Sequence, residues 1–503
     1  MFKDEWDFSF NPKHFFTPLT TLKGISTIVV LGCIAYFNAL FGAFVWDDFG
    51  QVRQNYFIRS LSNLPKFFTG GTFGDGAYLT GAYYKPLMTF SYAIIWSLFG
   101  NQPFFFHLLQ IILHIINSIL VFVLFRKFFK QQLALFLALI FLVHPINVEA
   151  VAYISALQEP LFFLFGMSAL HLSLKEPISA KRTLAIGLLL LCSLLSKETG
   201  ILFLLIIPVY HSIFRYRKHH LIRILLNVLP PVPMYAYLRF FVAKVSLHNQ
   251  FGIPISTATI TERVFTMPAI VLYYLKTFFI PKDLLTNQKW LITHHDMQFY
   301  VPLFIDTVFL IGVILFGVWI YRTRKVHFPL YLFFTLWFLI GLMLHVQVFP
   351  LDWTVADRWF YFPSVGLLGI IGVGIHTALL RSVRVTSALI IVGLIIIGIF
   401  TIRTMVRNTI WYNTITLRPK SVQQVDDFPM YDDYLNEQEQ GQELLDQGMI
   451  KEAVPHFVKS LELHPKIYVK ICHPELSKQY NAHCTPASKA LRDFGFDVHG
   501  YDK

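Results

Sequence analysis

The chain has 503 residues, of which 55% are hydrophobic and only 14% are charged. A soluble chain carries about 25% charged residues, so the composition excludes an ordinary soluble enzyme, a disordered chain and a nucleic-acid-binding protein. The formal net charge of +12 then fits basic residues in the cytoplasmic loops of a membrane protein. The sequence therefore predicts an all-α, polytopic membrane protein.

Apolar runs of about 20 residues predict membrane-spanning helices. The chain contains about 11 runs that fit a span or come near its length. They lie at residues 24–45, 103–125, 132–147, 150–174, 183–196, 199–214, 221–243, 300–321, 327–349, 360–380 and 385–402. Two further stretches, 86–100 and 264–281, are short or interrupted by proline, and we expect interfacial or re-entrant helices there.

The basic residues between these runs predict an orientation. Clusters of Lys and Arg follow the second, fourth, sixth, eighth and tenth runs, whereas the alternate turns contain few basic residues. Because basic loops stay in the cytoplasm, we expect residues 1–23 to be cytoplasmic and the C-terminus to be extracytoplasmic. The predicted parts are a transmembrane domain at 24–410, with its first outer loop at 46–102, and an extracytoplasmic helical tail at 411–503.

Two adjacent carboxylates, Asp47 and Asp48, directly follow the first apolar run. Charges at a membrane boundary are costly and mark functional sites by default. Such a pair suits a general base or the oxygen ligands of a divalent cation such as Mg²⁺ or Mn²⁺. The alternative is a polar cap, but Asp at a helix C-terminus opposes the helix dipole. We therefore expect a catalytic role for this pair.

The other predicted outer turns contain polar side chains that suit an anionic phosphate. These are Lys85, His144, Lys197 and Arg358. Each has a structural alternative. Lys85 lies in a solvated surface loop, Lys197 and Glu198 form a snorkelling pair, Asp357 and Arg358 pair locally, or the histidine only closes a helix end. We expect the cations to meet the phosphate of a lipid at the interface.

The polar tail contains one helix–turn–helix pattern at 434–467. Its small, aromatic and proline residues fall at the positions of a 34-residue tetratricopeptide repeat. They are Gly441, Gly448, Ala453, Phe457 and Pro465. The alternative is a generic amphipathic hairpin. One repeat cannot bury its own apolar face, so we expect it to pack on the membrane domain or on a partner protein.

Six polar segments follow one another in a definite order. They are Asp47-Asp48, Tyr84-Lys85-Pro86-Leu87, Phe106-His107 with His114 and Asn117, His144-Pro145 with Glu149-Ala150-Val151-Ala152, Ser196-Lys197-Glu198-Thr199-Gly200, and Asp357-Arg358-Trp359-Phe360-Tyr361-Phe362-Pro363-Ser364-Val365-Gly366. In this order they resemble the transmembrane and tetratricopeptide-repeat-containing O-mannosyltransferases and their prokaryotic relatives, which are GT-C glycosyltransferases. The resemblance runs over residues 25–410 and the repeat at 434–467.

This resemblance implies an inverting transfer of a sugar, typically mannose, from a dolichyl or other polyprenyl phosphate to an acceptor hydroxyl on the extracytoplasmic face. It also implies that Asp47 or Asp48 acts as the base toward that hydroxyl. Supporting positions in the same site are Tyr84, Glu149, Glu198 and Asp357. Relatives often have Glu where this chain has Asp357, and eukaryotic members carry many repeats. The donor sugar and the acceptor therefore stay open.

The implied partners are the lipid donor, a protein or glycan acceptor, membrane lipids and a protein bound by the tail. The implied location is the plasma or inner membrane in a prokaryote and the endoplasmic reticulum in a eukaryote. Two other functions remain open. A flippase for lipid-linked saccharides predicts charged mid-membrane faces and an internal repeat, and the sequence shows neither clearly. A non-catalytic scaffold predicts that the tail alone carries the function.

Overall fold

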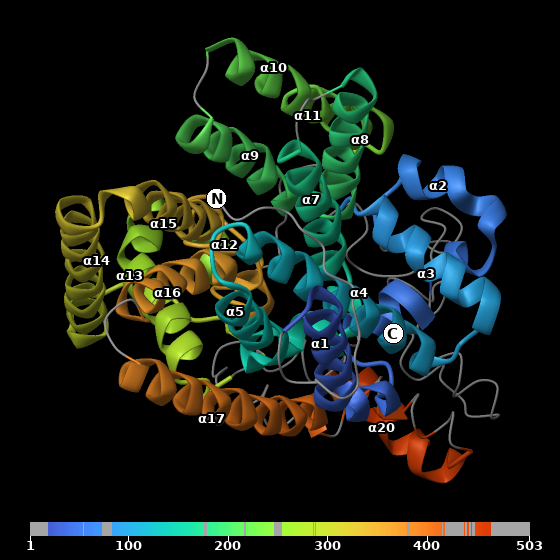
Figure 1. Cartoon of the computed structure of the whole chain (residues 1–503). Coiled ribbons are helices and arrows are strands. Elements are labelled where there is room, and N and C mark those ends of the chain that lie inside the picture. The colour runs from blue at the N-terminus through green and yellow to red at the C-terminus, as the bar shows by residue number, and fades with distance from the viewer. Residues whose placement is uncertain are drawn as a thin grey trace.

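The computed structural model describes residues 19–463 with several gaps. The gaps are 54, 73–82, 176–178, 216–217, 246–253, 285, 287, 380–382, 415, 418–436, 438–439, 442–443 and 445–447. Within the described residues, all regular structure is helical (Figure 1). Most of the predicted N-terminal segment, the repeat position Pro465 and the tail cysteines Cys472 and Cys484 lie outside the described residues.

Most of the longer helices occupy the apolar runs of the sequence, whereas α20 lies in the polar tail. The longer ones are α1 (Thr21–Tyr36), α3 (Pro86–Phe99), α4 (Pro103–Arg126), α5 (Gln131–Val143), α7 (Gln158–Ser173), α8 (Ala180–Ser196), α9 (Ile201–Phe214), α10 (Lys218–Val228), α13 (Ile260–Phe279), α14 (Met297–Thr323), α15 (Phe328–Met343), α16 (Pro363–Leu379), α17 (Val383–Asn408) and α20 (Ile450–Leu463). The short ones are α2 (Leu64–Thr69), α6 (Val148–Ala152), α11 (Pro231–Ala236) and α12 (Pro254–Thr257).

Local chemistry explains where several helices begin. Pro86 and Pro103 stand at the first position of α3 and α4, where the missing N–H costs nothing. The hydroxyl of Thr20 accepts a hydrogen bond from the Lys23 N–H at the start of α1. Thr259 and Glu262 form a capping box at the start of α13. The prolines remove a backbone donor that a helix start leaves open, and the caps at Thr20 and Thr259 satisfy one.

The predicted number of about 11 membrane spans is not confirmed. In the described part of the chain, six helices are long and apolar enough to cross a membrane, or seven if the bent pair Gln131–Val143 and Pro145–Ala152 is one span. Several of the other expected spans form shorter helices, because polar turns interrupt their apolar runs. For example, the run 150–174 breaks after Ala152, and its helix α7 has 16 residues.

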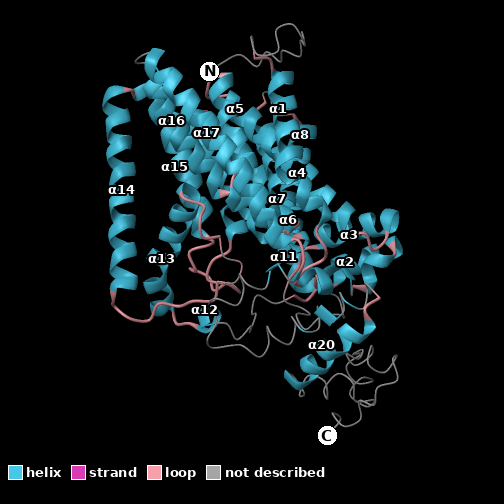
Figure 2. Cartoon of the chain, turned by 90° about the horizontal axis from the view of Figure 1, so that it is seen from below, coloured by secondary structure: helices cyan, strands magenta, loops and turns pink. Residues whose placement is uncertain are grey.

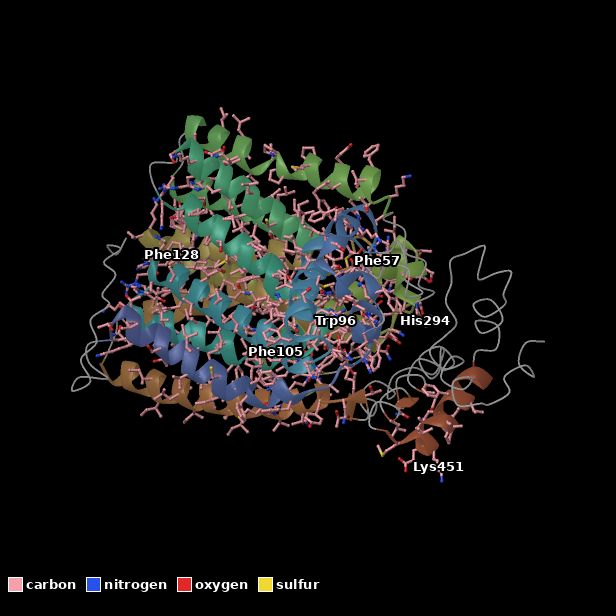
Figure 3. All side chains as sticks on the ribbon, turned by 90° about the vertical axis from the view of Figure 1, so that its right-hand side faces the viewer. Phe57, Trp96, Phe105, Phe128, His294 and Lys451 are labelled. Atoms are coloured by element: carbon pink, nitrogen blue, oxygen red, sulfur yellow. The ribbon has the colours of Figure 1, made fainter. Side chains whose placement is uncertain are left out.

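The helices form one elongated bundle (Figure 2). Phe128 and His294 mark its two ends in Figure 3. Predicted cytoplasmic turns meet at the Phe128 end. There the ring centroids of Phe128 and Phe214 lie 5.5 Å apart, and the Arg215 side chain donates a hydrogen bond to the Leu174 carbonyl. At the other end the longer loops gather, and α20 lies beyond them (Figure 2). The alternation of basic and non-basic turns in the sequence thus corresponds to two distinct ends.

Small residues allow α15 and α16 to pack closely. A Cβ on Gly366 would lie 2.4 Å from the backbone nitrogen of Phe338, and one on Gly369 would lie 2.1 Å from the Phe334 ring. Glycines at such crossings let helix backbones approach in membrane bundles. The segment Asp357–Phe360 lies two residues before α16.

The tail pattern is partly described. Phe457 and Ala453 of α20 are buried, and a Cβ on Gly441 would lie 2.7 Å from the Phe457 ring. Gly448 lies in the chain between Gly441 and α20, and its φ of +79° suits a tight turn. The small residues and Phe457 thus pack as the hairpin predicts, and assignment as a tetratricopeptide repeat stays a prediction.

Candidate active site

Asp48 is a buried carboxylate whose two oxygens are both engaged by the protein. One oxygen accepts hydrogen bonds from the Ser155 N–H at 2.7 Å and the Ser155 hydroxyl at 2.6 Å. The other accepts from the Val45 N–H at 2.9 Å. Burial nevertheless raises the pKa of Asp48 to about 7, against the lowering effect of these donors.

Asp47 differs from Asp48, because residue 47 as a whole is exposed, although protein atoms surround its carboxyl group. Its backbone N–H donates to the Tyr153 hydroxyl at 3.3 Å, and Tyr153 also hydrogen-bonds its carboxyl group. Surrounding protein atoms dehydrate the carboxyl and raise its pKa, while Tyr153, Arg358 and Lys85 act to lower it. Asp47 is therefore the carboxylate of the pair that can receive an external group.

The backbone between Val45 and Asp48 turns sharply at Trp46, which has a φ of +49°. A bulky residue in this region is a genuine outlier. The Trp46 ring stacks on Trp353 with centroids 6.1 Å apart and packs edge-on against Tyr153 and Trp411. The Trp46 ring thus lies in a group of aromatic rings that includes Tyr153, the hydrogen-bond partner of the Asp47 carboxyl group.

Arg358 is fixed by Glu149 of α6. The Arg358 guanidinium donates to one Glu149 oxygen, and the Arg358 backbone N–H donates to the other at 3.0 Å. Glu149 is 1% exposed, and the Arg358 side chain is 13% exposed. This pairing raises the pKa of Arg358, so the guanidinium stays charged beside Asp47.

Lys197 is paired in a similar way with Glu159. Its Nζ lies 2.5 Å from the Glu159 Oε1, in the first turn of α7. The neighbouring Glu198 binds Arg239 at 2.7 Å, and Arg239 lies in the π-helical segment Tyr237–Val242. The alternative of a local Lys197–Glu198 pair is wrong, because each residue binds a partner from a distant helix.

Lys85 differs from these cations. It is 8% exposed, and its Nζ lies 4.5 Å from the centre of the Tyr83 ring. Among the described residues, no carboxylate lies within ion-pair distance of its Nζ. Burial lowers the pKa of Lys85, while Glu198, Asp352 and Glu159 raise it at longer range. Lys85 is therefore a buried cation without a carboxylate partner in the described part of the chain.

The structure brings together eight charged residues that we call the polar cluster. They are Asp47, Lys85, Glu149, Glu159, Lys197, Glu198, Asp352 and Arg358. Tyr83 links its two sides, because its hydroxyl donates to Asp352 while its ring faces Lys85. The predicted outer turns thus converge at the loop end of the bundle.

Asp357 lies next to this cluster but is occupied by other partners. Tyr273 of α13 donates a hydrogen bond to it at 2.5 Å, and Arg407 of α17 lies 3.5 Å away. Burial raises the pKa of Asp357 to about 7, and Arg407 acts to lower it. These contacts tie three segments together, so the alternative of a local Asp357–Arg358 pair is wrong.

Two predicted site residues point elsewhere. The His144 ring accepts from the Ile146 N–H at 3.2 Å, and its Nε2 lies 2.9 Å from the Phe278 carbonyl oxygen. Both ring nitrogens are thus engaged by the backbone, so the phosphate-binding role expected for His144 has no support in the geometry. Tyr84 donates to the Phe68 carbonyl at 3.2 Å and is buried, which is a structural contact.

The donor set of the Asp47–Asp48 pair does not fit a divalent cation. Both Asp48 oxygens accept protein hydrogen bonds, which leaves Asp47 as the single ligand that this turn can offer. In the part of the chain that the structure describes, no group of three or more His, Cys, Asp or Glu side chains is arranged to hold a metal ion. Hard divalent cations need several oxygen ligands.

Several residues of the site escape sequence reasoning. Glu159, Tyr153 and Asp352 stand beside predicted positions, but nothing in the pattern says which charge each one faces. Ser155 and Arg239 carry no specific signal, because a serine near an apolar run and an arginine in the run 221–243 have bland explanations. Glu159 shows the one signal that could have identified such a residue: an isolated acidic residue in the first turn of an apolar helix.

Comparison with known proteins finds sequence similarity to O-mannosyltransferases. A family model described as dolichyl-phosphate-mannose-protein mannosyltransferase matches residues 84–237. A protein O-mannosyl-transferase of Caenorhabditis elegans is 25% identical over 372 residues, which is 69% of this chain and 50% of that protein. Protein O-mannosyl-transferase TMTC1 of Homo sapiens is 33% identical over 186 residues, 34% of this chain and 21% of that protein.

The chain thus spans half or less of the length of these relatives. The resemblance to O-mannosyltransferases that the motif order predicts is confirmed by these matches. Among solved structures, the oligosaccharyltransferase AglB of Archaeoglobus fulgidus, in complex with an inhibitory peptide and a dolichol-phosphate, is 13% identical. It has a TM-score of 0.42 and covers 85% of this chain and 59% of that chain.

Proposed function

We propose that this protein is a membrane glycosyltransferase that moves a sugar from a polyprenyl-phosphate donor to an acceptor hydroxyl. Mannose is the donor sugar that the similarity favours. The observation that carries the proposal is the position of the carboxylate of Asp47, an exposed residue, near the cations Arg358 and Lys85. A base and a place for a leaving phosphate then occur within one site.

In this proposal Asp47 is the base and Asp48 is not. An acceptor hydroxyl attacks the anomeric carbon, its proton passes to the Asp47 carboxylate, and the bond from that carbon to the phosphate oxygen breaks with inversion. Asp48 cannot approach a substrate, because it is buried and both oxygens accept hydrogen bonds. Tyr153, Arg358 and Lys85 favour the ionised form of Asp47 that the step requires.

The leaving phosphate is assigned to Lys85 and Arg358. Fixed positive charges stabilise a developing phosphate anion best where water is excluded. Lys85 is buried without a carboxylate at ion-pair distance among the described residues, whereas Glu149 neutralises much of the Arg358 charge. We therefore assign the main phosphate contact to Lys85 and a second contact to Arg358. Lys197, bound to Glu159, acts in shaping the site.

The membrane arrangement follows as part of the same proposal. The loop end of the bundle is assigned to the extracytoplasmic face and the basic end to the cytoplasm, because basic turns stay inside. A polyprenyl phosphate lies at an interface, and the polar cluster would meet it there. The acceptor is assigned to a protein or glycan hydroxyl, and the tail hairpin to contacts with that acceptor or another protein. No step of the proposal requires a metal ion.

The test uses the purified full chain in lipid nanodiscs with polyprenyl-phosphate-mannose and a panel of hydroxyl-containing peptides. Mannose transfer and release of polyprenyl phosphate are both measured. We expect Asp47→Asn to lower turnover by about 10³-fold, within the range for loss of a general base. Asp283→Asn, on an exposed residue outside the polar cluster, is the control. Full activity of Asp47→Asn would exclude the proposed base.

A further inference from the structure

We propose that Asp48 is a positioning residue that fastens the turn at residues 45–48 to Ser155 and thereby sets Asp47 against Tyr153. The inference rests on the proposed function, because it takes Asp47 as the base. Asp48 then positions Asp47 and takes no direct part in the chemistry, although a pair of adjacent acids suggests a chemical role for both.

The first step is the shape of the turn. With Trp46 at a φ of +49°, the chain reverses direction between Val45 and Asp48. The Asp48 N–H donates to the Val45 carbonyl at 3.0 Å, and the Asp48 carboxylate accepts from the Val45 N–H at 2.9 Å. Asp48 thus closes the turn from both sides. Outlying backbone conformations persist only where the surroundings hold them.

The second step is the anchor on the other side. Ser155 gives Asp48 both its N–H and its hydroxyl, and it lies two residues after Tyr153. Because the same short segment carries both residues, the bond to Asp48 also fixes where the Tyr153 hydroxyl meets Asp47. The contact joins positions that are 107 residues apart in the chain.

The third step is the rigidity of that segment. Gln110 of α4 donates to the Tyr153 carbonyl at 2.7 Å and to the Ala150 carbonyl at 3.2 Å. Tyr92 of α3 donates to the Ile154 carbonyl at 2.7 Å. Two helices therefore hold the segment that contacts Asp48. Through the contact between Ser155 and Asp48, this rigid segment fixes the position of the neighbouring Asp47.

The same arrangement explains the contrast between the two acids. The left-handed residue before them lets one carboxylate enter the protein while the other remains open to a substrate. If Asp48 lost its contacts, Asp47 would keep its chemistry but lose its fixed direction. Misplacement of a catalytic group by about 1 Å can cost 10²-fold in rate, so the effect falls on turnover more than on donor binding.

The test is a double-mutant cycle on the full chain in nanodiscs, with Asp48→Asn, Ser155→Ala and the double variant. An Asn side chain keeps the shape of Asp48 but cannot accept all three hydrogen bonds. We expect kcat to fall about 10²-fold in Asp48→Asn and about 10-fold in Ser155→Ala, with KM for the donor within about twofold. In the double variant the Ser155 change should add little, because the two side chains act as one unit.

Ser173→Ala is the matched control, since Ser173 is buried and its hydroxyl donates to the Leu170 carbonyl at the far end of α7. Ser155→Thr keeps a hydroxyl and should restore most of the turnover. Multiplicative losses in the double variant, or equal losses in Ser173→Ala, would overturn the inference.

Amide hydrogen exchange gives a measurement that does not depend on activity. Exchange at Val45 and Ser155 should accelerate in Asp48→Asn, because both amides donate to the Asp48 carboxylate. Unchanged exchange would overturn the tether even in an active enzyme. A wild-type chain without transferase activity would instead refute the proposed function, and with it the catalytic half of the inference, whatever the exchange result.

Discussion

Glu149 holds Arg358 at two points, because one carboxylate oxygen accepts from the guanidinium and the other from the backbone N–H of the same residue. The two residues are 209 positions apart in the chain. A contact to the backbone fixes where the outer turn lies, and a contact to the side chain fixes where its charge points. Glu149 therefore sets the place of the arginine beside Asp47.

Replacing Glu149 by glutamine should damage both stability and turnover. Removing one partner of a buried ion pair leaves an uncompensated charge, and such changes cost about 3–5 kcal/mol. We expect the free energy of unfolding to fall by about 3 kcal/mol, measured by denaturant titration of the purified protein in detergent. Glu262→Gln, in the exposed capping box of α13, should leave transfer unchanged. Wild-type stability in Glu149→Gln would contradict the buried pair.

The raised pKa of Asp48 predicts a pH dependence of stability. Its pKa in the folded protein is about 7, above the ordinary value near 4 of an unfolded chain. Between these two values the folded protein binds the proton more tightly, so the contribution of Asp48 to stability is largest below pH 4 and decreases as the pH rises to 7. A shift of this size corresponds to a change on the order of 4 kcal/mol.

Unfolding measured between pH 4 and pH 8 checks this expectation. Asp48→Asn cannot ionise and should therefore show a flatter dependence than the wild type. Asp357 has a similarly raised pKa and remains in both proteins, so the difference between the two curves isolates Asp48. Parallel curves would show that the folded carboxyl group titrates normally.

Lys85 should govern donor binding. Lys85→Gln removes a buried cation whose Nζ has no carboxylate at ion-pair distance among the described residues, so we expect KM for the lipid donor to rise about 10- to 100-fold, or about 1.4–2.7 kcal/mol. Lys85→Arg keeps the charge and should lose less. Lys276→Gln, on an exposed pair with Asp283, is the control. An unaltered KM in Lys85→Gln would contradict this assignment and would favour Arg358 or Lys197 as the main phosphate contact.

The sequence identified most of this site because charges are rare in so apolar a chain. Asp47, Lys85, Lys197 and Arg358 each interrupt an apolar pattern at an alternate turn, and alternate turns of a helical bundle meet at one end. Their convergence could therefore be predicted without any contact being known. The helices themselves were equally accessible, since their apolar runs and proline starts are local properties.

The remaining features depend on contacts between distant segments. No local pattern says that Asp48 is buried against Ser155, or that Lys197 binds Glu159 and not its neighbour Glu198. The contacts of His144 were equally inaccessible, because a histidine at a helix end has the same local sequence whether it faces a ligand or a backbone carbonyl. The number of spans was equally hard to predict, because helix length depends on where polar turns break a run, as at Tyr153, and composition averages over such breaks.

Packing between α15 and α16 gives a last prediction that concerns the scaffold. Gly366→Ala would place a methyl group 2.4 Å from the Phe338 nitrogen, so the helices must separate, and overpacking of this kind costs about 1–3 kcal/mol. Gly312→Ala in α14 is the matched control, because no described atom outside its own helix turn lies within 4 Å of the place that its methyl group would take. Thermal unfolding in detergent should show a lower transition temperature for Gly366→Ala only. Because α16 begins just after Arg358, transfer activity should fall in that variant as well, and equal behaviour of the two glycine variants would refute the close crossing.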